Sequence, residues 1–193
     1  MKTLTLLGAV TGIALFAGIR LYATVLTLGL CLRYGLLSLP PELSSLAVLS
    51  HPYVLVVAGV CGAAEFLADK IPWVDSLWDA LHAILRPAGA ALIAFAAVGR
   101  LDPAAEVAVV LLCGGVAFSS HSAKAGARLL VNQSPEPFSN LLLSLAEDAL
   151  AVGGSYSVIA HPLAALAVVA VFLALFALLA RRIFRRLRKK PPP

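Results

Sequence analysis

Ionisable side chains recur at helical spacing in otherwise apolar stretches of this 193-residue sequence. Steps of three or four residues place side chains on one face of a helix, so each group predicts a polar stripe. Acids and bases that converge in a medium of low dielectric can bind a charged solute or relay protons. The stripes are Glu65 and Asp69; Asp75, Asp79, His82 and Arg86; His121, Lys124, Arg128 and Asn132; and Asn140, Ser144, Glu147 and Asp148.

Two further residues join these candidates for solute binding or charge relay. Arg20 stands alone in a long apolar stretch, where it could snorkel, pair with Glu147 or Asp148, or hold an anion. A buried pair is the interpretation that we favour. Glu136 lies in the proline-flanked break at 134–137, and irregular backbone at membrane depth is tolerated only beside a cavity.

Specific enzymatic and metal chemistries find little support in the sequence. Asp79 and His82 have the spacing of two metal ligands on one helix face, but a lone instance is weak and we assign no metal site. No set of nucleophile and base is readable, and no phosphate-binding or dinucleotide motif occurs, so we name no catalytic residue and no cofactor. His51 and His161 each precede a proline, which favours helix capping over chemistry.

The composition indicates whether these polar stripes belong to a soluble protein or to a membrane protein. Hydrophobic residues make up 61% of the chain and charged residues 13%, with a mean hydropathy of +0.94. A soluble domain is about 45–50% apolar and about 25% charged. Disorder would need low hydrophobicity and high charge. We therefore predict an all-α, polytopic membrane helix bundle.

A spanning helix needs about 20 residues, so the chain holds roughly six spans. We expect the third to be kinked at Pro87 and the fifth to be a half-helix or a tilted span that ends at the glycine pair 153–154. Residues 1–180 would form one transmembrane domain, and residues 181–193 a basic tail. The expected spans are 4–32, 52–67, 71–98, 104–130, 138–152 and 163–180.

The distribution of basic residues predicts an orientation. Seven of the 15 basic residues lie in the last 13 positions. With six spans and both termini in the cytoplasm, 12 of the 15 face inward, as the positive-inside rule requires. We expect the tail to bind anionic lipid headgroups rather than nucleic acid, and the protein to lie in a bacterial inner (plasma) membrane.

Two weaker patterns concern symmetry and assembly. Residues 17–21 are similar to residues 125–129, which raises a possible internal repeat. Gly8 and Gly12 have the small-xxx-small spacing that lets helices approach closely, so a homo-oligomer is possible through them.

Four segments together carry a resemblance to a known family. The chain resembles a family of small bacterial multi-pass membrane proteins that is catalogued only as a domain of unknown function. The likeness covers about residues 12–152; it implies an integral membrane protein and brings no activity or site with it. The segments are Glu-Phe-Leu-Ala-Asp-Lys-Ile-Pro-Trp-Val-Asp at 65–75, Arg-Pro-Ala-Gly-Ala at 86–90, His-Ser-Ala-Lys-Ala-Gly-Ala-Arg at 121–128 and Asn-Gln-Ser-Pro-Glu-Pro at 132–137.

Three functions remain open at this stage. The first hypothesis is a small transporter or channel for a small charged or polar solute, such as an anion bound by His121, Lys124 and Arg128, with the acidic residues balancing charge or carrying protons. The second is a membrane enzyme or flippase that acts on phospholipid headgroups at the cytoplasmic face; an enzyme is the less favoured. The third is a structural or assembly protein whose intramembrane charges only pair.

Overall fold

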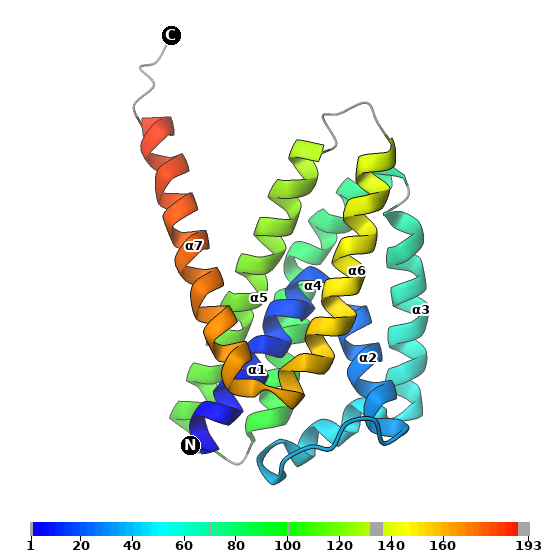
Figure 1. Cartoon of the computed structure of the whole chain (residues 1–193), viewed down its shortest axis with the longest axis vertical. Coiled ribbons are helices and arrows are strands. Elements are labelled where there is room, and N and C mark those ends of the chain that lie inside the picture. Colours follow the sequence, from blue (N-terminus) through cyan, green and yellow to red (C-terminus); the bar gives the residue numbers. More distant parts are fainter. Residues whose placement is uncertain (1, 70, 100, 132–136, 189–193) are drawn as a thin grey trace.

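The fold is a bundle of helices without strands among the residues that the structure describes. The structure is a computed structural model, and it describes residues 2–69, 71–99, 101–131 and 137–188 (Figure 1). The elements are the α-helices α1 (Lys2–Ile19), α2 (Leu21–Arg33), α3 (Pro52–Ala68), α4 (Pro72–Val98), α5 (Pro103–Val131), α6 (Pro137–Ala160) and α7 (Pro162–Arg188), and the 3₁₀ helix η1 (Pro41–Ser50). The predicted all-α class is confirmed.

Proline sets the start of six of the eight elements, from η1 to α7. A proline at the first helical position is favourable because its missing N–H has no partner there and its φ angle is already helical. Side chains cap some of these starts. His51 Nδ1 accepts a hydrogen bond from the Tyr53 amide, and Asp102 Oδ1 accepts from the amide of Ala104. The predicted capping role of His51 is confirmed.

The apolar helices are long enough for a multi-pass membrane protein. Five described helices are long and apolar enough to cross a membrane, or up to six if η1 and α3, which meet at a bend of 65°, count as one span. Large apolar side chains cover their outer faces; Val60, Ile84 and Leu111 are 66–75% exposed. Exposed apolar surface on this scale suits lipid and not water.

The first predicted span is broken in two. Arg20 has non-helical dihedrals (φ −146°, ψ 88°), α1 ends before it and α2 begins after it. The chain then turns back. Gly8, near the start of α1, packs against Pro162, and Gly29, near the end of α2, packs against Leu49 at the same end of the bundle (Figure 1). The continuous helix expected over residues 4–32 is therefore wrong.

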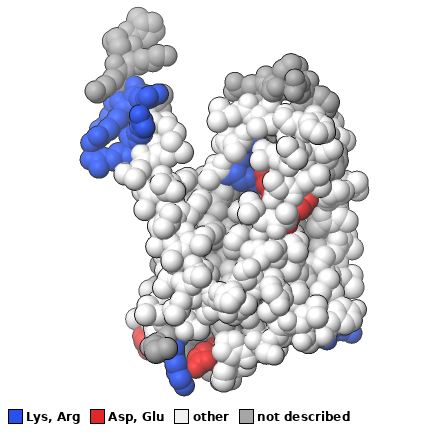
Figure 2. All heavy atoms as spheres, viewed as in Figure 1, with Lys and Arg blue, Asp and Glu red and all other residues white. Residues whose placement is uncertain are grey.

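This reversal places the two chain ends at opposite ends of the bundle (Figure 1). The N-terminus lies beside the start of α7, and the last described residue, Arg188, lies at the far end of that helix. α1 runs away from the end of the bundle that holds the N-terminus and α2 returns to it, so the expectation that both termini share one side does not fit this arrangement. The basic end of α7 lies at the opposite end of the molecule from the N-terminus (Figures 1 and 2).

Three predicted spans are close to the observed helices, and two are too short, since α7 continues to Arg188 and α6 also runs further than predicted. α3 and α5 nearly match their predicted ranges, and the third span is the single helix α4, which continues through Pro87. α6 runs to Ala160 and does not stop at the glycine pair. A Cβ atom at Gly154 would collide with the Phe16 ring, so this glycine allows close packing instead of ending the helix.

The centre of the bundle is α1. Its small residues approach α5, α6 and α7, and Ala9, Ala14 and Ala17 are almost fully buried. A Cβ atom at Gly8 would meet the backbone of α7, and one at Gly12 would meet Val158 of α6. These two glycines therefore pack inside one chain and are not available for the homo-oligomer considered above.

Candidate functional site

Ten charged side chains gather in one ion cluster, which α3, α4, α5, α6 and the α1–α2 break all supply. Nine of them are buried, and Asp148 is 29% exposed. Figure 2 shows a small group of basic and acidic side chains among the uncharged residues of the bundle. The members of the ion cluster are Arg20, Glu65, Asp69, Asp75, Asp79, Arg86, Lys124, Arg128, Glu147 and Asp148.

Arg20 joins α3 and α6 at the break between α1 and α2. Its guanidinium pairs with Asp69, and it lies 3.3 Å from Glu147 Oε2 through Nη2 and 3.1 Å from Asp148 Oδ1 through Nε. Nη2 also donates a hydrogen bond of 3.0 Å to Ser144 Oγ. The buried pair that we favoured for Arg20 is confirmed. Because a guanidinium has five N–H donors, one residue can hold several carboxylates at once.

Arg128 of α5 binds carboxylates from three directions. It forms a two-point contact with Glu147, from Nη2 at 2.7 Å and from Nε at 3.1 Å. Nη2 also lies 3.2 Å from Asp69 Oδ2, and Nη1 donates to Asp75. Paired charge-assisted bonds of this kind fix the geometry of both partners.

Arg86 links α4 to α3 and α5. Its Nη2 atom donates to Glu65 Oε1 at 2.6 Å, and its Nη1 atom donates to Asp79 Oδ1 at 3.1 Å. Nη1 also lies 2.6 Å from Nδ1 of His121. Since an arginine can only donate, His121 accepts at Nδ1 and carries its ring proton on Nε2.

Lys124 is the fourth base of the cluster. Its Nζ atom is 3.4 Å from Glu147 Oε2 and 3.7 Å from Asp79 Oδ1. It also donates to the carbonyl oxygen of Ile19, the last residue of α1. The basic stripe of α5 thus faces the acidic residues of α3 and α4, as its spacing predicted.

His82 lies beside the ion cluster and is held by aromatic partners. Its Nδ1 atom is 2.8 Å from the Trp78 carbonyl oxygen, and its Nε2 atom is 3.3 Å from the Tyr22 hydroxyl. Its ring stacks on Trp78 with centroids 4.8 Å apart. Sequence reasoning missed Tyr22 and Trp78, although Tyr22 follows Arg20 by two residues and Trp78 precedes His82 by one turn.

Three predicted site residues cannot be placed in this arrangement. Asn132 and Glu136 lie outside the described residues, and Asn140 is described only as part of the α6 backbone.

The ion cluster is not electrically balanced. Six carboxylates face four basic side chains, which leaves two carboxylates in excess. Each of the four bases already pairs with at least two carboxylates. Because unbalanced buried charge is unfavourable, such a group of side chains favours the uptake of protons or of a small cation.

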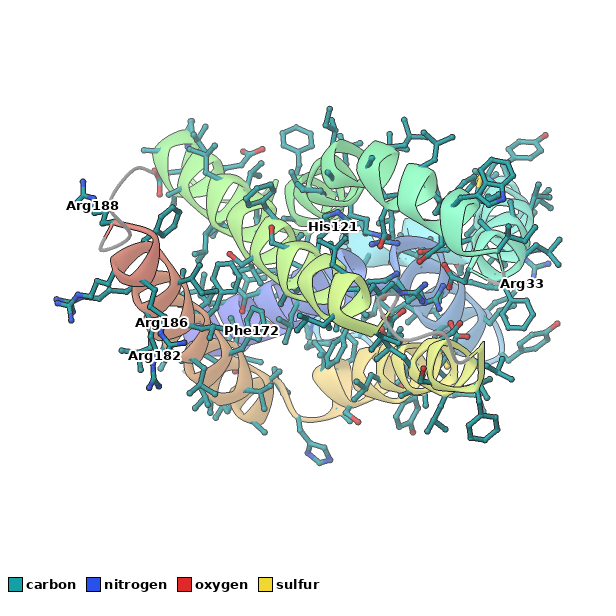
Figure 3. All side chains as sticks on the ribbon, turned by 90° about the horizontal axis from the view of Figure 1, so that it is seen from above. Arg33, His121, Phe172, Arg182, Arg186 and Arg188 are labelled. Atoms are coloured by element: carbon teal, nitrogen blue, oxygen red, sulfur yellow. The ribbon has the colours of Figure 1, made fainter. Side chains whose placement is uncertain are left out.

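A cavity of about 510 Å³ between α4 and α5 reaches the ion cluster. Figure 3 places His121 on the side of α5 that faces α4. Ala83 also lines the cavity, and its carbonyl oxygen has no helical donor because Pro87 lacks an N–H. The polar and charged lining consists of Asp75, Asp79, His121, Ser122 and Arg128.

Among the described residues, no group of three or more His, Cys, Asp and Glu side chains is arranged to hold a metal ion.

The comparison with family models identifies the chain. The model of a domain of unknown function, DUF4126, matches residues 7–182. The chain belongs to this family. The DUF4126 match includes every member of the ion cluster and most of α7, and the resemblance seen in the sequence is thus confirmed. No curated protein and no solved structure matches the chain.

Proposed function

We propose that this DUF4126 protein is a small transporter or channel that moves a proton or a small cation through the ion cluster. The observation that carries the proposal is the cavity between α4 and α5, because it connects a buried site with excess carboxylates to the outside of the bundle. A purely structural charge network has no need of such access. Buried ionisable groups beside a cavity are typical of solute and proton pathways in membranes.

The charges favour a cation over the anion considered first. An anion would need a basic side chain with no carboxylate partner. Arg20, Arg86, Lys124 and Arg128 all have such partners within the cluster. The same pairing weakens the case for a phospholipid headgroup, whose phosphate would also need free basic groups.

Asp79 is the residue through which we expect the cluster to exchange its proton or cation. It lines the cavity and retains 8% exposure, whereas Glu65 and Asp69 are 1–2% exposed. Its Oδ1 atom contacts both Arg86 and Lys124, so a change in its charge affects two bases on two helices.

The break at Arg20 supports the same proposal. Secondary transporters commonly bind their solutes at discontinuous helices, whose ends supply backbone groups and partial charges. Here the break lies inside the bundle: Arg20 at the break is a member of the ion cluster, and the carbonyl oxygen of Ile19 before it accepts a hydrogen bond from Lys124.

Orientation and lipid contacts belong to the proposal as well. We infer that the basic end of α7 lies in the cytoplasm of a bacterium, with the N-terminus outside the inner membrane. Arg182, Arg186 and Arg188 point away from the bundle (Figure 3), where anionic lipid headgroups can bind them.

The test is proton flux into proteoliposomes that contain a pH-sensitive dye, driven by a potassium diffusion potential. We expect the wild type to acidify the lumen about tenfold faster than protein-free liposomes, and Asp79→Asn to remove most of that excess. Glu106→Gln is the matched control, because Glu106 lies in the first turn of α5 at the other end of the bundle. Wild-type flux that survives in Asp79→Asn would remove Asp79 from the pathway.

A structural role is the second candidate, and one observation favours it. All four buried bases are already paired, as expected if the charges only hold the helices together. Wild-type liposomes with no flux of protons, sodium or potassium, together with rescue between charge-swapped pairs, would establish this role.

A further inference from the structure

Two buried hydroxyl groups outside the ion cluster have no hydrogen-bond partner among the described residues. They belong to Thr24 of α2 and Ser155 of α6, both 0% exposed. Several other helical hydroxyls among the described residues bond to the preceding turn; Thr11 donates to the Leu7 carbonyl and Ser157 to the Gly153 carbonyl. Ser155 and Ser157 share one helix, so the helix type does not explain the difference.

A buried hydroxyl without a partner is unfavourable, and native proteins resolve it with water or a ligand. If the surroundings were dry, replacing the hydroxyl by an apolar group would stabilise the protein. The two hydroxyls therefore indicate places where water or a hydrated solute spends part of its time.

Both hydroxyls lie between the ion cluster and the end of the bundle that holds the N-terminus. Thr24 follows Arg20 by one turn, about 6 Å along α2, and Ser155 follows Glu147 by about 12 Å along α6. Both helices run toward the N-terminal end, and they pack against each other (Figure 1).

Small and polar residues continue along the α6 face between the cluster and Ser155. Ser144, Glu147, Ala151 and Ser155 follow one another at steps of three and four residues, which places them on one face of the helix. All four are buried, and Ser144 already bonds to Arg20. The face of α6 that carries Glu147 thus has buried small and polar residues from the cluster to Ser155, and we call the packed region of α2 and α6 around Thr24 and Ser155 the seam.

We propose that this seam, marked by Thr24 and Ser155, is the route by which the ion cluster exchanges its proton or cation with the side of the membrane that holds the N-terminus. The cavity between α4 and α5 serves the other side. The inference rests on the proposed transport function and adds the second half of its path. In the structure the seam is packed, so exchange through it requires α2 and α6 to separate.

The experiment compares Thr24→Val and Ser155→Ala with wild type in the proteoliposome assay, with a dye reporting protons and separate runs reporting sodium and potassium. Thr11→Val and Ser157→Ala are the matched controls, because their hydroxyls have backbone partners. We expect the two seam variants to lower the flux about tenfold while melting at the same temperature as wild type or higher. The controls should stay within about twofold of wild-type flux.

Thr24→Ser tests whether the flux depends on the hydroxyl group or on the shape of the side chain. It restores the hydroxyl without the methyl group, and we expect it to keep most of the flux. Wild-type flux that disappears in Asp79→Asn but persists in Thr24→Val and Ser155→Ala would overturn the seam and leave the transport function standing. Absence of flux in the wild type would overturn both.

Discussion

The side-chain amine of Lys124 donates a hydrogen bond of 3.3 Å to the carbonyl oxygen of Ile19, the last residue of α1. The last carbonyls of a helix lack intrahelical donors, and a nearby cation stabilises them. The same amine contacts Asp79 and Glu147. Lys124 therefore connects the break between α1 and α2 to the ion cluster. A charge added to the cluster changes the electrostatic interactions at the break through this amine.

Replacement of Lys124 by methionine should destabilise the protein strongly. The change keeps the apolar stem but removes the cap of α1 and leaves two carboxylates with less compensation. Loss of one partner of a buried pair costs about 3–5 kcal/mol. Thermal unfolding in detergent measures the effect, and Lys2→Met is the control, because Lys2 pairs with Glu42 at an exposed site. Equal melting temperatures of Lys124→Met and wild type would contradict the assigned contacts.

Reversing the charges of the pair formed by Asp75 and Arg128 distinguishes an effect on stability from an effect on transport. Asp75→Arg and Arg128→Asp should each lower the melting temperature by leaving a buried charge unpaired. The double variant should recover part of that loss, as coupled residues do in a double-mutant cycle. We expect its proton flux to stay low, because both side chains line the cavity. Full recovery of both properties would favour a purely structural pair.

Close helix packing predicts intolerance to a single methyl group at Gly18. A Cβ atom there would collide with Ala117 and Ser120 of α5. Gly18→Ala should therefore reduce the yield of monodisperse protein and its melting temperature. Gly126→Ala is the control, because nothing lies near that position and alanine favours the helix. Similar behaviour of the two variants in size-exclusion chromatography would show that α1 and α5 are further apart than described.

Sequence patterns predicted the faces of the site better than its backbone. Asp75, Asp79 and Arg86 fall on one helix face by spacing alone, and the lipid argument identified them as buried. The break at Arg20 has no such local signal, because neither a proline nor a glycine occupies the position. It depends on partners that are more than 40 residues away in the chain, such as Asp69 and Glu147.

At the glycine pair 153–154 we predicted a helix end that the structure does not have. Glycine commonly ends helices, but it also permits close packing, and only the position of Phe16 decides between these roles at Gly154. A single sequence does not contain that long-range contact.

The turn at Arg20 makes a prediction about membrane topology. Peptide tags placed at the two ends of the chain should lie on opposite sides of the membrane. In sealed vesicles of known orientation, a protease added outside should remove one tag and spare the other. Removal of both tags together would show that α1 and α2 cross the membrane after all, and the seam route would lose its basis.

The sign of the charge that crosses the membrane tests the central claim most directly. Proteoliposomes adsorbed on a solid-supported membrane report a transient current after a sudden change in one ion. We predict an inward movement of positive charge after a jump in protons, sodium or potassium, reduced about tenfold by Asp79→Asn. A current after a jump in chloride or phosphate, or no current above that of protein-free liposomes, would contradict the proposal that the ion cluster carries cations or protons.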